Sequence, residues 1–279
     1  MTLVQTIFIA SVLIAPFASL DVHAHNACDV DLTAGITINA NSIEFLEASD
    51  SHHNDSDSLY KISQGKDLFV DNQRIELSHS QQALISEYDA RIRELVPQVK
   101  SVAIEGVDLA IDGIDLAFNG LLGEDNDVSA DLTQELKEIR EQVKTKLSIE
   151  KGITVGVDGL EGEALLGKDF EQRIEKLVEK TMLNSMGSIL MAMGKQMISS
   201  DVQEASFEER MEEFGDTIEQ EMSARAEKIS AQAQALCRNI AKVDSLEEQI
   251  KDNIKVLAHV NVFTVTHSQY GEEKHALSM

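Results

Sequence analysis

The acidic segment between two predicted helices is the part of the sequence that comes nearest to a metal-binding motif. It reads DNDVSADLT from Asp125 to Thr133, like the oxygen-rich start of a calcium loop. Such a loop needs glycine at its sixth position, where this chain has Ala130, and a bidentate Glu at its twelfth, where it has Leu136. We therefore expect an ordinary loop and no calcium here.

Histidines near the N-terminus raise a second question of metal binding. Cleavage of a leader after Ala24 would make His25 the first residue, and a terminal amine chelates copper together with its own imidazole when another His is nearby. No spacing ties His25 to a second ligand, so we expect no metal site. The candidates for that ligand are His52, His53, His259 and His267.

No arrangement of nucleophile and base is visible in the sequence. The Asp and Glu residues are scattered over predicted helix faces, and no Ser-His-Asp or Cys-His pattern is present. Cys237 has no His within thirteen residues on either side. We therefore predict no catalytic, cofactor-binding or metal residues, and a non-catalytic protein is favoured over an enzyme.

The N-terminal segment 1–24 has the features of a signal peptide. An apolar run ends near Pro16 and is too short to span a membrane, and Val22-His-Ala24 is a small-x-Ala cleavage site, although Lys and Arg are missing before the run. Lipidation of Cys28 is the competing interpretation. The triplet His25-Asn-Ala27 before Cys28 argues against it.

The two cysteines of the chain predict one disulfide, between Cys28 and Cys237. An even number of cysteines in an exported protein favours a bridge, with two free buried thiols as the alternative. The bridge would close a loop of about 210 residues and stabilise the fold by about 5 kcal/mol at most on the chain-entropy model.

Composition excludes several classes of partner. The formal net charge of −25 opposes binding to nucleic acid and anionic lipid. There is no Trp, and the aromatic content of 4% argues against stacking platforms for sugars or bases. No later segment is apolar and long enough to span a membrane. The 43% of hydrophobic residues suffice for a real core.

Residues 25–78 predict a small antiparallel sheet. Short runs with period-two apolar positions are separated by turn residues such as Gly65 and Asp71-Asn-Gln73. The polar stretch 47–58 predicts a solvated loop. The runs are Ile36–Asn39, Ser42–Leu46, Leu59–Ile62, Asp67–Val70 and Arg74–Leu77.

From Ser78 the apolar period becomes helical. Ser78 and Gln81 form a capping box, and apolar residues recur every three or four positions from Leu84 to Leu121. Pro97 removes a backbone hydrogen bond inside this run, so we predict a kink or a break at Val96–Pro97. Close approach of another helix is predicted where glycines recur every seven residues, at Gly106, Gly113 and Gly120.

Three further helices are predicted, over about Asp131–Ile149, Lys168–Ser199 and Phe207–Leu257. A glycine-rich loop with room for one strand at Ile153 separates the first two. The last helix would be about 75 Å long if straight, which indicates an elongated molecule. Residues 258–279 form a tail in which residues 259–266 suit an edge strand.

The third of the four predicted helices is rich in Met, which serves both as ordinary core filler and as an adaptable binding surface. We expect core. The residues predicted to point inward are Phe170, Ile174, Leu177, Met182, Met186, Ile189, Met193 and Met197.

The apolar seam of the last helix needs a cover. We expect the other helices to supply it as an antiparallel bundle. The alternative leaves the seam open around Met211–Met222 for a client peptide, an acyl chain or a second subunit, with Arg225 and Gln232 tuning which partner fits.

The segment Leu77–Pro97 carries Leu77, Gln81, Tyr88, Ala90, Arg93 and Pro97 in a fixed spacing. With one Cys soon after the signal peptide and a second late in the last helix, the chain resembles the YggN-like family of exported proteobacterial proteins of unknown function. The resemblance extends over the chain from the cleavage site to about Asn253. It implies a periplasmic location in a Gram-negative cell and no known activity.

Together these features predict an α+β fold in which a small N-terminal antiparallel sheet (25–78) is followed by an elongated helical region (79–257) with a long amphipathic C-terminal helix. The favoured function is a non-catalytic binding, scaffold or chaperone-like role in the periplasm. The partner would be a protein or an apolar ligand of the envelope, and the oligomeric state stays open. The alternative is a periplasmic enzyme or metal-binding protein.

Overall fold

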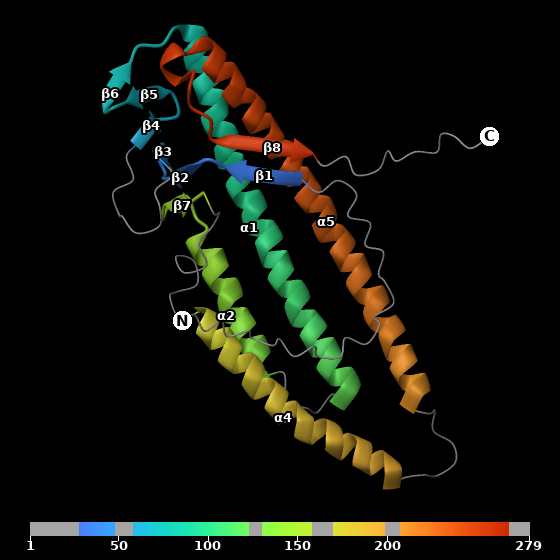
Figure 1. The fold of residues 1–279 in the computed structure, drawn as a ribbon. Helices are drawn as coiled ribbons and strands as arrows, with labels where there is room; N and C mark the ends of the chain where they lie inside the picture. The colour runs from blue at the N-terminus through green and yellow to red at the C-terminus, as the bar shows by residue number, and fades with distance from the viewer. Residues whose placement is uncertain (1–27, 48–57, 123–129, 158–169, 199–206, 268–279) are drawn as a thin grey trace, which may run out of the picture.

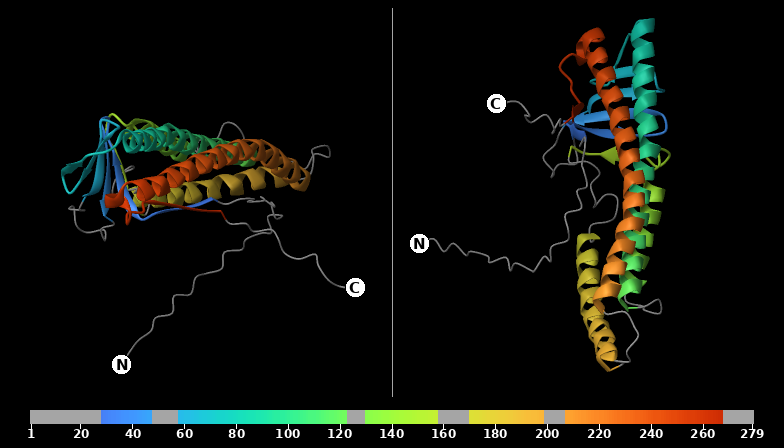
Figure 2. Two further views of the ribbon diagram at one scale, coloured as in Figure 1. Left: turned by 90° about the horizontal axis from the view of Figure 1, so that it is seen from above. Right: turned by 90° about the vertical axis from the view of Figure 1, so that its right-hand side faces the viewer.

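The computed structural model of the protein describes residues 28–47, 58–122, 130–157, 170–198 and 207–267. The predicted signal peptide and the predicted polar loop at 47–58 lie outside these residues, apart from the ends of that loop. Figures 1 and 2 show an elongated molecule with a β-sheet at one end and long helices extending from it. The α+β prediction, with an N-terminal antiparallel sheet and a long C-terminal helix, is confirmed.

Six antiparallel strands form the sheet, in the order β6-β5-β4-β3-β2-β7. The loop between β5 and β6 has two residues, Asp71 and Asn72, both with positive φ, which suits a tight hairpin turn. The glycine-rich region supplies the strand β7, which pairs with β2. The strands are β2 (Ala34–Ile38), β3 (Ser42–Glu47), β4 (Ser58–Ser63), β5 (Asp67–Val70), β6 (Gln73–Ile75) and β7 (Ile153–Val155).

One face of this sheet is apolar and buried, as the period-two pattern predicts. Its side chains pack on Ile85, Tyr88 and Ile92 of the first helix and on Val243 and Ile250 of the last. The other face carries a polar row in register, in which Thr154, Thr37, Glu44 and Lys61 are successive neighbours. The buried hydrophobic residues of this sheet are Ala34, Ile36, Ile38, Ile43, Phe45, Tyr60, Ile62, Leu68 and Ile153.

The first helix, α1 (His79–Leu122), begins at the predicted capping box. The Ser78 amide donates to Gln81 Oε1 at 2.8 Å, and the Gln81 amide donates to Ser78 Oγ at 3.3 Å. Gln81 Nε2 also donates to the carbonyl of Asn253 at 2.7 Å, which ties the start of α1 to the end of the last helix. Of the predicted kink or break at Val96–Pro97, the break was wrong, because α1 continues through Pro97 to Leu122, and the kink stays a prediction.

Three further helices extend away from the sheet beside α1: α2 (Ala130–Lys146), α4 (Phe170–Ile198) and α5 (Phe207–Asn253). We use the name legs for four helical segments that extend away from the sheet. They are α2, α4, the part of α1 beyond Pro97 and the part of α5 before Cys237. The last helix ends at Asn253 rather than Leu257, where a 3₁₀ turn, η1 (Lys255–Leu257), redirects the chain. No helix in the described part of the chain has the length and hydrophobicity needed to cross a membrane.

The predicted close helix approach holds at two of the three glycines. A Cβ at Gly120 would overlap the ring of Phe214, and one at Gly113 would lie 3.4 Å from Met222 Sδ, both on α5. At Gly106 the prediction was wrong, since nothing lies within 4 Å of a Cβ there.

A separate two-stranded ribbon lies across α5 (Figure 1). It pairs β1 (Cys28–Leu32) with β8 (Phe263–His267) in antiparallel register, with Val30 opposite Val265. The strand predicted in residues 259–266 therefore pairs with the first strand of the chain and not with the large sheet. Both ends of the described chain meet on α5.

Candidate functional site

The outward face of α4 carries large apolar side chains exposed to solvent. Val178, Met182, Leu183 and Met186 are 40%, 63%, 65% and 64% exposed. Residues 178, 182 and 186 recur at four-residue spacing and therefore follow one side of the helix. We call these four residues the α4 stripe. Single exposed apolar side chains are ordinary, but neighbouring ones mark an interaction surface.

The prediction that Met182 and Met186 point inward was wrong. The side of α4 that packs against the protein carries Phe170, Ile174 and the buried Thr181. Phe170 and Ile174 pack on a small core of α2 and β7, which consists of Ile139, Val143, Leu147 and Ile153. This contact leaves the stripe on a different side of α4. Ile189, Met193 and Met197 lie outside the side chains that the structure describes.

The apolar seam of α5 is covered unevenly. Next to the sheet, Val243, Leu246 and Ile250 are buried. In the legs, Phe214 and Met222 are only half-buried against α1, and Met211 lies outside the described side chains. The bundle therefore covers the seam fully near the sheet and partly in the legs.

The two polar seam residues that the sequence analysis singled out, Arg225 and Gln232, bind α1. Arg225 forms an ion pair with Asp112, and Gln232 Nε2 donates to Glu105 Oε1 at 2.7 Å. Lys228 lies 3.2 Å from Glu105 Oε2. The hydrogen bond from Gln232, and then the one from Lys228, lower the pKa of the Glu105 carboxyl. Arg225 and Gln232 therefore hold two legs together.

A buried polar cluster joins the sheet to the C-terminal ribbon. Glu247, which is 2% exposed, accepts hydrogen bonds from the amides of Val262 at 2.9 and 3.0 Å and of Phe263 at 2.9 Å. Tyr88 also donates to Glu247 at 3.4 Å and lies 3.4 Å from the hydroxyl of Tyr60. Burial raises the pKa of all three groups. Because they are nearly inaccessible, we interpret the cluster as a structural clamp.

Sequence reasoning missed this cluster, although one feature pointed to it. Glu247 lies four residues after Val243 and three before Ile250, so a charged residue occupies a position of the apolar seam. A buried carboxylate needs hydrogen-bond donors, and here the start of β8 supplies them.

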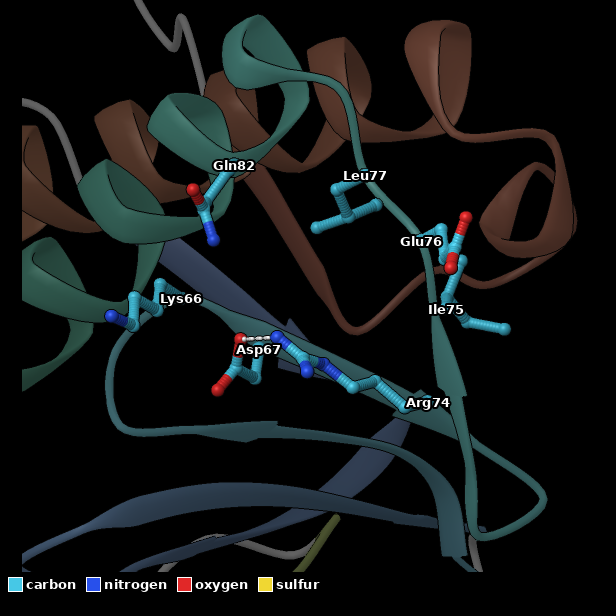
Figure 3. Close-up of a pocket in the computed structure, with 7 residues that line it drawn as sticks. All are labelled: Lys66, Asp67, Arg74, Ile75, Glu76, Leu77 and Gln82. Carbon is cyan, nitrogen blue, oxygen red and sulfur yellow. Dashed lines mark hydrogen bonds and ion pairs between the residues drawn. The ribbon is translucent and has the colours of Figure 1, made fainter.

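A polar hollow of about 370 Å³ lies between the β5–β6 hairpin and the start of α1 (Figure 3). Arg74 Nη2 lies 2.7 Å from Asp67 Oδ1, so the guanidinium already has a carboxylate partner. Figure 3 shows Leu77 and Gln82 pointing towards the hollow. It contains no paired nucleophile and base, and we assign it no chemistry. The lining residues are Lys66, Asp67, Arg74, Ile75, Glu76, Leu77 and Gln82.

Most of the metal candidates of the sequence lie outside the part of the chain that the structure describes. The described part of the chain has no cluster of three or more His, Cys, Asp or Glu residues suited to a metal ion. His259 is exposed. Most of the calcium-like segment lies outside the description, as do His25, His52, His53 and the side chain of His267.

The structure places the two cysteines on elements that touch. Cys237 is buried in α5 and carries no free thiol. Cys28 opens β1, which contacts α5. Since the side chain of Cys28 lies outside the description, the pairing of Cys28 with Cys237 stays a prediction.

Comparison with known proteins gives one family. The family described as "Protein of unknown function (DUF2884)" matches residues 28–263, which include every described helix and strand except β8, of which only Phe263 is covered. No curated protein and no solved structure matches the chain.

Proposed function

Because the chain belongs to this family of proteins of unknown function, we propose a role from its own surface. The protein is a non-catalytic binding protein of the cell envelope, in a scaffold or chaperone-like role, that presents its legs to a partner. The observation that carries this proposal is the α4 stripe, where large apolar side chains face solvent side by side.

The arrangement of α4 supports a binding role over a purely structural one. The helix is held to α2 by its first turns and by ion pairs of Arg173 with Glu135 and of Lys180 with Asp131. The stripe contributes little to this packing, because each of its side chains is at least 40% exposed. An apolar face that does not build the core is available for a partner.

A hydrophobic dye tests this role. We expect the native protein to enhance the dye's fluorescence, and the double variant Leu183→Ser/Met186→Ser to lose most of that enhancement without a change in helix content. The control is Lys137→Ser/Glu138→Ser on the exposed face of α2, which leaves the apolar surface intact. A native protein that binds no dye would remove the proposal.

Export is the second part of the proposal. The features of residues 1–24 and the resemblance of Leu77–Pro97 support it. We expect the protein in the periplasmic fraction of a Gram-negative cell, with an intact mass that corresponds to a chain beginning at His25. A protein that stays in the cytoplasmic fraction and retains residues 1–24 would contradict export.

A further inference from the structure

Several cations of the legs hold the helices to one another. Of the described cations of α4, Arg173 and Lys180 bind carboxylates of α2, and Lys176 alone lacks such a pair. Arg140 of α2 lies 2.7 Å from Asp108 of α1. On α5, Arg225 and Lys228 pair with α1. Of the described cations of α4 itself, Lys176 is therefore the one left to attract a partner's anions.

Carboxylates, in contrast, stand exposed around the α4 stripe. Glu175 lies three residues before Val178 and Glu179 three before Met182, so both are on the stripe's side of α4. The far end of α4 lies closest to the first turns of α5 (Figures 1 and 2), and the segment Phe207–Lys228 has eight acidic residues against three basic ones. Among the described residues of the segment Phe207–Lys228, the exposed carboxylates that form no ion pair are Glu212, Asp216, Glu219, Glu221 and Glu227.

We propose that the α4 stripe binds a basic amphipathic segment of another polypeptide. This inference rests on the proposed function and names its partner. The segment's apolar face would cover Val178, Met182, Leu183 and Met186, and its Lys or Arg residues would face the surrounding carboxylates. From 178 to 186 the stripe is about 12 Å long, which matches two to three turns of a bound helix.

Charge favours a basic segment over two other possible partners of an apolar stripe, which are a second copy of the chain and an uncharged acyl chain. A second copy of the chain would bring the same exposed carboxylates and a net charge of −25, so its approach is opposed by like charges. An uncharged acyl chain would gain nothing from Glu175 and Glu179. A cationic segment gains from both features, apolar burial and opposite charge.

The test uses the purified protein and three labelled synthetic peptides. The first is a basic amphipathic helix of Leu and Lys, the second replaces each Lys by Glu, and the third scrambles the first so that it has no apolar face. We expect the first peptide to bind at least about tenfold more tightly than either of the others by fluorescence anisotropy. Raising the salt concentration is expected to weaken the binding of the basic peptide, because salt screens the attraction between its Lys residues and the carboxylates of the protein.

Two pairs of variants locate the site. Leu183→Ser/Met186→Ser is expected to weaken binding of the basic peptide about tenfold, whereas Lys137→Ser/Glu138→Ser leaves it unchanged. Glu175→Gln/Glu179→Gln is expected to weaken it several-fold, whereas Glu87→Gln/Glu94→Gln, with the same change of charge beside the sheet, leaves it unchanged. Binding that ignores the stripe or Glu175 and Glu179 overturns the assignment.

The remaining outcomes separate this inference from the proposed function. Equal binding of the basic and acidic peptides, or dye binding with no peptide binding, overturns the basic partner and leaves an apolar binding surface. Self-association that Leu183→Ser/Met186→Ser abolishes assigns the stripe to a second copy and also overturns the inference. Failure of both the dye and the peptides removes the inference and the proposed function together.

Discussion

Replacing Glu247 with Ala is expected to lower the free energy of unfolding by about 3–5 kcal/mol. The substitution leaves the amides of Val262 and Phe263 without their acceptor in a buried place and deprives Tyr88 of its partner. It also opens a cavity between α5 and the C-terminal ribbon. Denaturant unfolding followed by circular dichroism measures the loss.

The neighbouring Glu248 provides a matched control. It is exposed, and its pair with Lys251, at 2.7 Å, is a surface ion pair, so Glu248→Ala should cost no more than about 1 kcal/mol. Glu247→Gln keeps one acceptor oxygen and should fall between the two. Equal stability of the Glu247→Ala and Glu248→Ala variants would contradict a clamp.

The same carboxyl makes stability depend on pH. Burial raises the pKa of Glu247 above its ordinary value of 4.5, so the folded protein binds this proton more tightly than the unfolded chain. Its contribution to stability is full below about pH 4.5 and is lost as the pH rises through the raised pKa. Relative to Glu247→Gln, which does not titrate, the native protein should therefore lose stability as the pH rises from 4.5. A constant difference between them would contradict this.

Reduction of the protein is expected to lower the free energy of unfolding by about 2–5 kcal/mol. The predicted Cys28–Cys237 bridge joins the first strand to the last helix, so its loss frees a long loop in the unfolded chain. The strand β1 lies against α5, where Cys237 is buried. Unfolding midpoints with and without reductant measure the effect.

The control for reduction is the double variant Cys28→Ser/Cys237→Ser, whose stability should match that of the reduced protein and should not respond to reductant. Thiol labelling in denaturant without reductant gives an independent answer. Two reactive thiols per chain would show that the bridge does not form.

Local patterns in the sequence were sufficient for most of the secondary structure. The alternation of Ile43, Phe45, Tyr60 and Ile62 predicted strands with one buried face, because successive side chains of a strand point to opposite sides. The capping box at Ser78 predicted the start of α1, because its hydrogen bonds join residues only three positions apart. Such interactions join residues that are close in the sequence, so a local sequence pattern can predict them.

The sequence predicted only part of the candidate site. The sequence showed that α4 is rich in Met and that its apolar residues recur at helical spacing, but not which of them would be covered. Contact of Phe170 and Ile174 with the small core of α2 and β7 decided this, and it left Met182 and Met186 exposed. Glu247 was visible as a charge within an apolar seam, whereas its donors lie fifteen and sixteen residues away, on the chain as it enters β8.

The sequence by itself determined where helices and strands form, the strongly acidic charge and the apolar period of each helix. Only the tertiary structure decided that β8 pairs with β1, that β7 joins β2, and that the outer side of α4 stays open. The physical reason is that the spacing of apolar residues assigns them to one face of a helix or strand. Whether that face is buried depends on elements that are far away in the sequence. The tertiary structure also decided that the Glu247 carboxyl is buried, where it clamps the C-terminal ribbon to α5.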